Sequence, residues 1–259
     1  MSEAYANKLI ALPGANLKMR ERDLMRGGTE AMLEIPVPSF LIEHQQGLVL
    51  FDTGVNPRVP DDPEGYWGPA AKFLNVSCTA DQIVDRQVRA HGYKPEDVKY
   101  VVVSHLHLDH AGGLALFPNA QFVIMKGELP YAYWPDRRAR GGFILGDLLP
   151  TRGFDWRELT EDTDLFGDGS LRILRTTGHT PGECSMMVRL KRSGAMVLTG
   201  DTIHIRRQVD TLAAMAGDFD ESEASRSIQR LKDMQESKAA RLWISHAPED
   251  WANYPHEMD

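Results

Sequence analysis

The chain of 259 residues carries 37 acidic and 29 basic residues, a formal net charge of -8, and 42% of its residues are hydrophobic. That hydrophobic content suffices for a buried core, whereas the acidic balance and the scattered Arg and Lys residues exclude nucleic acid as a partner. The two cysteines, Cys78 and Cys184, have no Cys-x-x-Cys spacing, which excludes both a disulfide framework and a thiolate zinc site.

The N-terminal region lacks the basic start and long apolar run of a secretory signal, and no apolar stretch approaches the length of a membrane span. We therefore expect a cytoplasmic protein that does not act at a membrane. No repeat, low-complexity tract or flexible linker interrupts the sequence, so residues 1–259 are expected to form a single domain.

Short apolar runs bounded by turn residues predict strands, and apolar positions at helical spacing predict helices between them. The predicted strands are Lys8–Leu12, Leu33–Glu43, Leu48–Phe51, Tyr100–Val103, Gln121–Met125, Leu171–Arg175, Ser185–Leu190, Ala195–Leu198 and Leu242–Ser245. The predicted helices are Thr79–His91, Gly127–Tyr133 and Glu221–Gln235, and the predicted long surface loops are Asn56–Val76 and Trp134–Asp155. Strands interleaved with helices in this way indicate an α/β fold of stacked sheets covered by helices.

The predicted strand Tyr100–Val103 runs into a segment that is dense in metal-binding side chains. His105, His107, Asp109 and His110 lie within six positions, followed by a Gly-Gly pair that allows a tight bend. Imidazole nitrogen and carboxylate oxygen are suitable ligands for zinc, and a catalytic zinc site keeps one position open for water. A single histidine would more often be an ordinary buried or surface residue, but four such side chains in one loop favour a metal site.

Three later segments each place one candidate ligand after a predicted strand. They are Thr-Gly-His-Thr-Pro-Gly around His179, Thr-Gly-Asp at Asp201 and Ile-Ser-His at His246. Taken singly, the two histidines could be ordinary polar residues and the aspartate could cap a turn. In combination with the first cluster, all three become candidate ligands.

This set of motifs resembles that of the metallo-β-lactamase superfamily, whose H-x-H-x-D-H signature corresponds here to the cluster from His105 to His110. The resemblance spans nearly the whole chain and implies an αβ/βα sandwich of two mixed sheets flanked by helices. It implies two Zn²⁺ ions per chain, although other divalent metals could replace them. The implied ligands are His105, His107 and His179 for one ion, Asp109, His110 and His246 for the other, and Asp201 between them.

The resemblance also implies a mechanism in which a metal-bridging hydroxide attacks a carbonyl carbon, so that no protein nucleophile is needed. Asp109 would then pass a proton to the leaving group. Asp52 stands where the superfamily has a carboxylate that orients a ligand histidine, although an aspartate that forms a turn before Gly54 explains it equally well.

Within the superfamily, the chain is most similar to the N-acyl-homoserine lactonases, which open quorum-sensing lactones and related γ-lactones. The similarity rests on Lys8–Leu12, on the Ile-Pro-Val-Pro-Ser-Phe run from Ile35, on Gly92–Val98, and on Phe219-Asp220 before the last predicted helix. A small-molecule lactone is therefore the expected partner, with the protein a monomer or a homodimer.

One position departs from the lactonase pattern. His204 stands where many of these enzymes have a tyrosine that donates a hydrogen bond to the substrate, and imidazole can also donate one. Alternatively, His204 merely lines the pocket. The expected wall of the acyl pocket consists of Leu17, Met19, Met25, Trp67 and Phe73, although apolar residues at such positions often only pack in a core.

The alternative functions lie in the same superfamily. A glyoxalase II-like thioesterase would use the same seven ligands, but such enzymes add a C-terminal helical domain, and this chain ends soon after His246. A β-lactam hydrolase usually lacks an aspartate at the position of Asp201, and a flavodiiron-type oxidoreductase has a carboxylate in place of His107. A nuclease would need a basic face, and a non-catalytic scaffold would be expected to have lost ligands.

Overall fold

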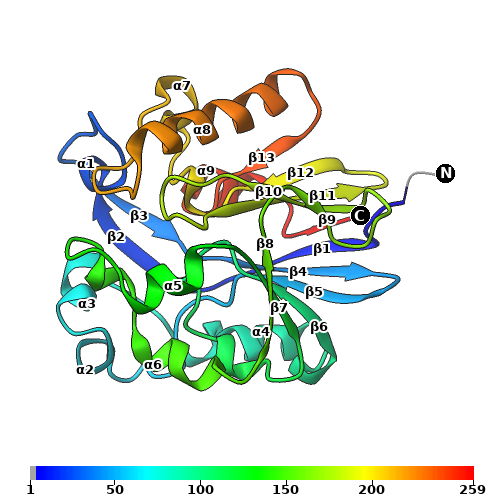
Figure 1. Ribbon diagram of the computed structural model, residues 1–259, viewed down its shortest axis with the longest axis horizontal. Helices are drawn as coiled ribbons and strands as arrows, with labels where there is room; N and C mark the ends of the chain where they lie inside the picture. The colour runs from blue at the N-terminus through cyan, green and yellow to red at the C-terminus, as the bar shows by residue number, and fades with distance from the viewer. Residues whose placement is uncertain (1–3) are drawn as a thin grey trace.

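Two mixed β-sheets stack face to face, and helices cover the outer face of each sheet (Figure 1). The computed structural model describes residues 4–259. The arrangement confirms the expected α/β sandwich. Among the described residues, no helix is long and apolar enough to cross a membrane.

The larger sheet has the strand order β14-β1-β4-β5-β6-β7-β8. Its pairing is antiparallel from β14 to β5 and parallel from β5 to β8. The strands are β1 (Lys8–Leu12), β4 (Ser39–His44), β5 (Gly47–Phe51), β6 (Val98–Val102), β7 (Gln121–Met125), β8 (Asp155–Leu159) and β14 (Glu257–Met258).

The smaller sheet has the order β13-β12-β11-β10-β9. Among its pairs of neighbouring strands, β12 and β13 are parallel and the other pairs are antiparallel. Its strands are β9 (Thr163–Asp164), β10 (Leu171–Arg175), β11 (Cys184–Leu190), β12 (Gly194–Leu198) and β13 (Arg241–Trp243). Because β10, β12 and β13 point the same way, their carboxyl ends meet at one edge of the sheet.

Alternating side chains supply the separate core layers. Val102 faces the core between the two sheets, where Phe40 packs against Trp243, while its neighbour Val101 faces the helices outside. This division follows from the two-residue period of a strand and explains why the central strands are apolar on both faces.

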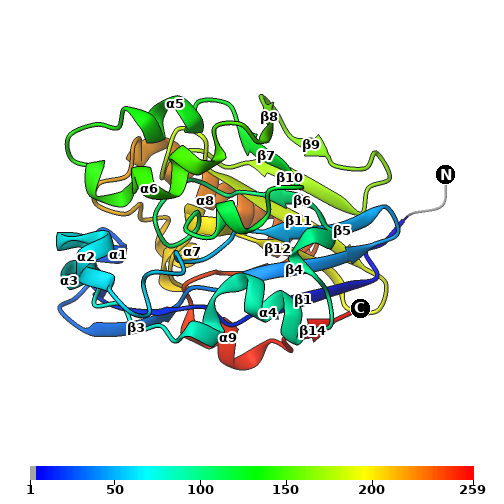
Figure 2. The ribbon, with the colours of Figure 1, turned by 90° about the horizontal axis from the view of Figure 1, so that it is seen from below.

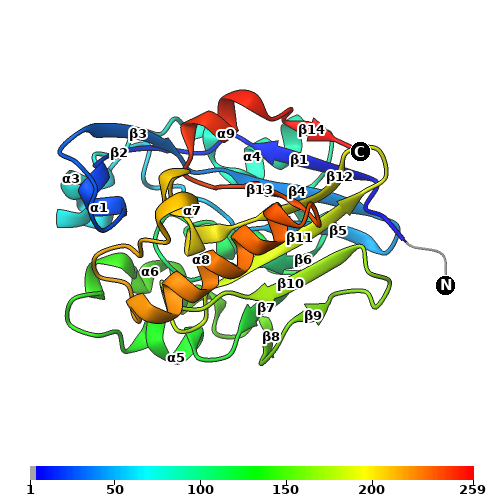
Figure 3. The same ribbon diagram turned by 90° about the horizontal axis from the view of Figure 1, so that it is seen from above.

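Helices complete the layers on both sides. Figure 2 shows α4 (Val84–Ala90) over β1 and β4, where Val88 packs into the outer core with α5 (Glu128–Tyr133) and α6 (Leu145–Leu148). Figure 3 shows α8 (Glu221–Glu236) lying across the smaller sheet. Two of its own residues, Ile228 and Leu231, are buried in the core between the helix and this sheet. The shorter α7 (Arg207–Thr211) packs against α8, and Trp251 of α9 (Pro248–Asn253) packs against the core between the two sheets.

A two-stranded ribbon projects beside one end of the sandwich. It consists of β2 (Asn16–Arg20) and β3 (Met32–Pro36), linked through α1 (Glu21–Leu24), and it packs with α2 (Pro63–Trp67) and α3 (Pro69–Leu74) around a core of its own. These two helices lie within Asn56–Val76, which we predicted to be a loop. Likewise, α6 and two short 3₁₀ turns lie within the predicted loop Trp134–Asp155.

The prediction of one strand over Leu33–Glu43 is wrong, because this run divides between two sheets as β3 and β4. Pro36 and Pro38 lack the backbone N–H that a continuous strand needs at both positions. The ribbon strand β3 therefore ends at Pro36, and β4 of the larger sheet begins at Ser39, directly after Pro38. The predicted helix Thr79–His91 also divides, into a 3₁₀ turn at Ala80–Gln82 and α4.

Candidate active site

The candidate ligands gather where the two sheets meet at one end of the sandwich. His179, Asp201 and His246 follow the carboxyl ends of β10, β12 and β13, and the cluster His105–His110 follows the carboxyl end of β6 in the facing sheet. The fold thus brings together side chains that are far apart in the sequence.

The first group consists of His105, His107, His179 and Asp201. The Nδ1 atom of His107 lies 2.9 Å from Nε2 of His105 and 3.0 Å from Nε2 of His179. The Oδ2 atom of Asp201 lies 3.7 Å from the His105 nitrogen and 3.5 Å from that of His179. Four ligand atoms therefore converge on one small space.

The second group consists of Asp109, His110 and His246. The Nε2 atoms of His110 and His246 are 3.4 Å apart, and Oδ2 of Asp109 lies 3.7 Å from each of them. The other oxygen of Asp201, Oδ1, lies 3.1 Å from the His110 nitrogen and 3.0 Å from the His246 nitrogen. Asp201 therefore directs one oxygen into each group.

Hydrogen bonds on the outer side of the cluster fix which nitrogen of each ring faces inward. Nδ1 of His110 lies 2.9 Å from Oδ2 of Asp52, and Nδ1 of His246 lies 2.7 Å from the carbonyl oxygen of Pro36. An Nδ1–H that donates to an outer oxygen leaves a lone pair on Nε2.

The same holds for two more rings. Nδ1 of His179 lies 2.8 Å from Oδ1 of Asp218. Nδ1 of His105 is hydrogen-bonded to Oγ of Ser104 at 3.0 Å and lies 3.1 Å from Oε2 of Glu183. These outer oxygens direct the Nε2 lone pairs of four histidines into the cluster, which is the usual arrangement of metal-binding imidazoles in proteins.

The electrostatics of the cluster match a cation-binding site. Burial lowers the pKa of His105 and His107 well below the ordinary value, and neighbouring imidazoles lower it further, so these rings are neutral. Burial alone would raise the pKa of Asp201, but the surrounding histidines outweigh it and hold that pKa well below the ordinary value. Burial also acts to lower the pKa of His110, His179 and His246, but neighbouring carboxylates outweigh it and raise their pKa. Metal binding must therefore displace protons from these three rings, around a carboxylate that is already ionised.

This donor set fits two metal ions. In a tetrahedral zinc site with Zn–N of roughly 2.0–2.1 Å, ligand atoms are about 3.3 Å apart, close to the spacings found here. Oδ1 of Asp201 is buried and has no hydrogen-bond donor among the described residues, as expected for an oxygen that serves a cation. The two groups are arranged as a dinuclear metal centre.

Two buried glutamates that we did not identify from the sequence hold the ligand loops together. Glu128 accepts hydrogen bonds from the backbone N–H groups of Leu106 and Gly182, each at 3.0 Å. Glu183 accepts one from the backbone N–H of Asp201 at 3.0 Å, through the oxygen that does not face His105. These bonds fix the positions of the loops before any metal binds.

Close packing explains several glycines of the motifs. The predicted tight bend at Gly112 and Gly113 does not require a left-handed backbone, because neither has a positive φ. A Cβ on Gly112 would instead lie 2.1 Å from the backbone nitrogen of Asn56, and one on Gly178 would lie 2.2 Å from that of Ala224. At these positions the backbones approach too closely for any side chain.

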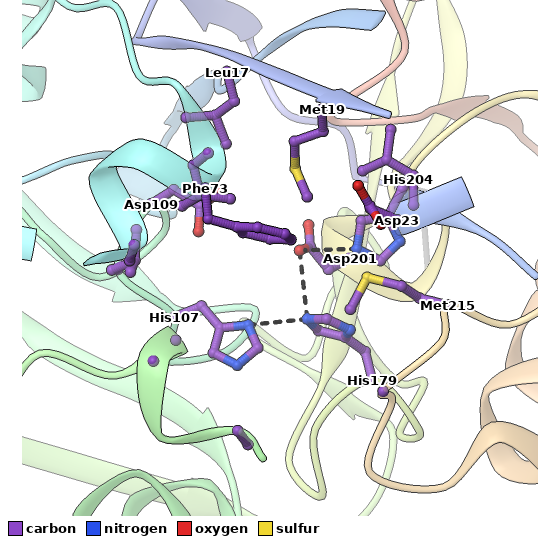
Figure 4. A pocket seen from close by; sticks show the side chains of 18 of the residues that line it. Leu17, Met19, Asp23, Phe73, His107, Asp109, His179, Asp201, His204 and Met215 are labelled. Atoms are coloured by element: carbon purple, nitrogen blue, oxygen red, sulfur yellow. Dashed lines mark hydrogen bonds and ion pairs between the residues drawn. The ribbon is translucent and has the colours of Figure 1, made fainter. Parts of the chain in front are cut away.

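A pocket of about 460 Å³ opens over the metal-binding cluster (Figure 4). His107, Asp109, His179, Asp201, His204 and His246 lie at its base, and most of its wall is apolar. Of the five residues predicted to form the acyl wall, Leu17, Met19 and Phe73 line this pocket.

The other two predicted wall residues, Met25 and Trp67, do not line the pocket. Both are buried in the core of the ribbon, with 1% and 3% of their surface exposed, and they support the wall from behind. The sequence shows that these residues are apolar but not whether they face a core or a cavity. Conversely, it gave no reason to place Arg22, Asp23 and Arg138 in the pocket wall.

Asp109 and His204 both face the space above the cluster. Figure 4 shows His204 joined to Asp201, and the distance from its Nε2 to Oδ2 of Asp201 is 3.2 Å. The Nδ1 atom of His204 is buried without a hydrogen-bond partner among the described residues. For Oδ1 of Asp109, no bond to another described residue is present.

The positions that orient the ligands differ in how well the sequence indicates them. Asp52 is found beside its histidine, as the resemblance implied, whereas Glu183 and Asp218 were not predicted. Glu183 directly follows the Thr-Pro-Gly turn, and Asp218 directly precedes the Phe219-Asp220 pair. Position next to a recognised motif is therefore the signal that could have identified both.

Comparisons with known proteins agree with this geometry. Residues 33–246 match the metallo-beta-lactamase superfamily. The chain is 36% identical to the N-acyl homoserine lactonase AttM of Azorhizobium caulinodans over 252 residues, 95% of each protein.

Two solved structures share the fold. One is an N-acyl homoserine lactone hydrolase with the product N-hexanoyl-L-homoserine at its catalytic metal centre, with a TM-score of 0.86, 24% identity, and coverage of 97% of this chain and 98% of that one. The other is AidC, a dizinc quorum-quenching lactonase, with a TM-score of 0.70, 18% identity, and coverage of 99% and 92%. The chain belongs to the metallo-beta-lactamase superfamily and, within it, to the N-acyl homoserine lactonase group.

Proposed function

We propose that the protein is a metal-dependent lactonase that opens the ring of N-acyl-homoserine lactones. The observation that carries the proposal is the placement of Asp201, whose two carboxylate oxygens face two separate groups of metal-binding side chains at the base of a largely apolar pocket. The AttM relative, which covers 95% of this chain, supports the choice of substrate.

The proposed metal is zinc, held by His105, His107 and His179 in one group and by Asp109, His110 and His246 in the other, with Asp201 shared. Imidazole and carboxylate ligands at these spacings suit zinc, and the similar AidC is a dizinc enzyme. The chemistry supplied by two such ions when bound is activation of water at neutral pH and polarisation of a carbonyl group. Other divalent metals with the same ligand preferences could take their place.

The pocket wall suits an acyl chain attached to a small polar ring. Leu17, Met19 and Phe73 form part of an apolar surface above the ligands, on the side of the ribbon and α3 (Figure 4). An acyl tail that packs there would remove apolar surface from water while the ring stays over the cluster. The wall thereby excludes water from one side of the reacting ester.

Asp109 is the proposed proton carrier. One of its oxygens, Oδ2, is directed toward His110 and His246, while Oδ1 has no bond to another described residue. The carboxylate lines the pocket, so that its free oxygen can deliver a proton to the alcohol that leaves when the ring ester opens.

His204 is the proposed substrate-positioning residue. Its backbone N–H donates to Oε1 of Gln208 at 2.7 Å, which fixes the main chain beneath the ring. Its Nδ1 atom is buried, so Nε2, which lies 3.2 Å from Oδ2 of Asp201 at the pocket, is the nitrogen proposed to meet an oxygen of the substrate.

Proton release tests the proposed function. Zinc-loaded protein would be mixed with N-hexanoyl-homoserine lactone in weak buffer with a pH indicator, and a chelator-stripped sample would serve as control. Because lactone opening liberates a carboxylic acid, we expect rapid, metal-dependent acidification. If the loaded protein leaves the lactone intact but cleaves a glutathione thioester or a β-lactam, the lactonase proposal is wrong and the alternative hydrolase is correct.

A further inference from the structure

The segment between α7 and α8 forms part of both the pocket wall and the support of the metal-binding cluster. Met215, Ala216 and Gly217 line the pocket, and Figure 4 shows Met215 beside His179. The next residue, Asp218, is buried, with 3% of its surface exposed. A buried carboxylate requires hydrogen-bond donors, and the donors it finds here connect the two parts of the site.

The two carboxylate oxygens of Asp218 serve different partners. Oδ1 lies 2.8 Å from Nδ1 of His179, and Oδ2 accepts a hydrogen bond of 2.8 Å from the backbone N–H of Met215. The first contact orients a candidate metal ligand. The second closes the turn that places Met215, Ala216 and Gly217 in the pocket wall.

Neighbouring backbone contacts join the same two elements. The N–H of Phe219 donates to the carbonyl oxygen of His179 at 3.0 Å, and the N–H of Asp220 donates to that of Gly178 at 2.9 Å. From the segment that follows α5, Nη2 of Arg138 donates to the carbonyl oxygens of Asp218 and Phe219, at 3.0 and 3.2 Å. Arg138 therefore binds the backbone next to Met215–Gly217, which we call the wall segment, and has no bond to the imidazole of His179 among those found in the described chain.

Only a carboxylate satisfies both donors. An asparagine has one acceptor oxygen and one NH₂ group, so it can accept from either the His179 ring or the Met215 N–H but not from both. Loss of either bond leaves a buried donor without a partner, and loss of the negative charge weakens the orientation of the imidazole.

We propose that Asp218 is a positioning residue that couples metal binding at His179 to the order of the acyl-pocket wall at Met215–Gly217. The proposal rests on the proposed function only for the nature of the pocket ligand. Since coupling is reciprocal, metal binding at His179 steadies the wall, and an acyl chain packed on the wall strengthens metal binding.

The test compares Asp218→Asn with two matched variants. Asp52→Asn makes the same change at the other Asp–His pair, away from the wall segment. Arg138→Gln removes the clamp on the wall but leaves the imidazole contact. The two readouts are zinc affinity, by competition with a chromogenic chelator, and hydrogen–deuterium exchange of the amides from Met215 to Phe219 in zinc-saturated protein.

We expect Asp218→Asn to lower zinc affinity by about 10- to 100-fold and also to speed exchange in the wall segment. Asp52→Asn should lower zinc affinity with wild-type exchange from Met215 to Phe219 in zinc-saturated protein. Arg138→Gln should speed this exchange and lower zinc affinity less than Asp218→Asn does, because the bond between Asp218 and His179 stays intact. Wild-type affinity or wild-type exchange in Asp218→Asn would overturn the proposal.

Two further measurements keep the proposal testable. If Asp218→Asn does not fold, stripping zinc from the wild-type protein should itself speed exchange from Met215 to Phe219, and unchanged exchange would contradict the coupling. If lactones are hydrolysed, the KM of Asp218→Asn should rise more for a decanoyl than for a butanoyl substrate. Neither affinity nor exchange requires turnover, so failure of the lactonase proposal would leave both readouts intact.

Discussion

The carboxylate of Asp52 and the imidazole of His110 form a buried pair in which Oδ2 and Nδ1 are 2.9 Å apart. The other oxygen of Asp52 accepts a hydrogen bond of 2.7 Å from the backbone N–H of Ser104, at the start of the ligand loop. Asp52 has a φ of 60°, a left-handed conformation that costs a non-glycine residue about 1 kcal/mol or more. A strained backbone is thus maintained where it orients a candidate metal ligand.

Asp109→Asn separates metal binding from proton transfer. The amide oxygen can still face His110 and His246, but the side chain can no longer carry a proton to the leaving alcohol. We expect the variant to keep most of its metal and to lose roughly 10²- to 10⁴-fold in kcat, as for loss of a general acid. Full activity at normal metal content would exclude Asp109 as the proton carrier.

His204→Phe tests the positioning role of this imidazole. The phenyl ring fills a similar space but cannot form a hydrogen bond in place of Nε2 of His204, so lactone opening should slow with little change in metal content. His204→Gln, whose amide can donate, should recover part of the loss. Equal rates in all three proteins, with the same pH–rate profile, would show that His204 only lines the pocket.

Phe73→Ala and Trp67→Ala distinguish a pocket wall from its supporting core. Phe73 is 62% exposed, so its removal should change stability by less than about 0.5 kcal/mol and raise the KM of long-chain lactones more than that of short-chain ones. Trp67 is 3% exposed and packs in the ribbon core, so its removal should cost about 3–5 kcal/mol. Denaturant unfolding and steady-state kinetics measure both, and a stability loss of that size in Phe73→Ala would contradict the assignment.

Asp147 should make the stability of the fold depend on pH. It accepts hydrogen bonds from Tyr66 and Asn56, but burial outweighs them and raises its pKa from 3.8 to about 7. Between these values the folded protein holds a proton that the unfolded chain has released, so stability falls as the pH rises. Above pH 7 both states are ionised and this contribution becomes constant.

The matched variant is Asp147→Asn, which cannot ionise and keeps an acceptor oxygen for Tyr66 and Asn56. We expect the free energy of unfolding of the variant, relative to that of the wild type, to rise by roughly 1.4 kcal/mol per pH unit from pH 5 to 7. Above pH 7 this difference should stay constant. Urea unfolding at a series of pH values measures the difference. A difference that does not vary with pH would show that Asp147 is ionised throughout.

The sequence predicted the chemistry of the site better than its surroundings. The metal-binding side chains occur at short, specific spacings, so their types alone indicated a metal site and the superfamily. The resemblance also placed Asp52 beside a ligand, although the residues alone left its role open.

The remaining features depend on contacts between distant segments. Asp218 adjoins a recognised motif, but its local sequence does not show which ligand it contacts, because it reaches His179 only through the packing of α8 against the smaller sheet. In the same way, Trp67 and Phe73 are both large apolar residues on neighbouring short helices, yet only Phe73 faces the pocket. Apolar character predicts burial or binding, and only tertiary packing decides between them.

The metal content of the purified protein is the most direct test of the dinuclear centre. The protein would be supplemented with zinc, freed of excess metal by gel filtration and analysed by elemental mass spectrometry, with Asp201→Ala prepared in parallel. Because Asp201 directs one oxygen into each group, we expect about two zinc ions per chain in the wild type and a clear loss in the variant. Well under one ion per chain in the wild-type protein would contradict the dinuclear centre and the function built upon it.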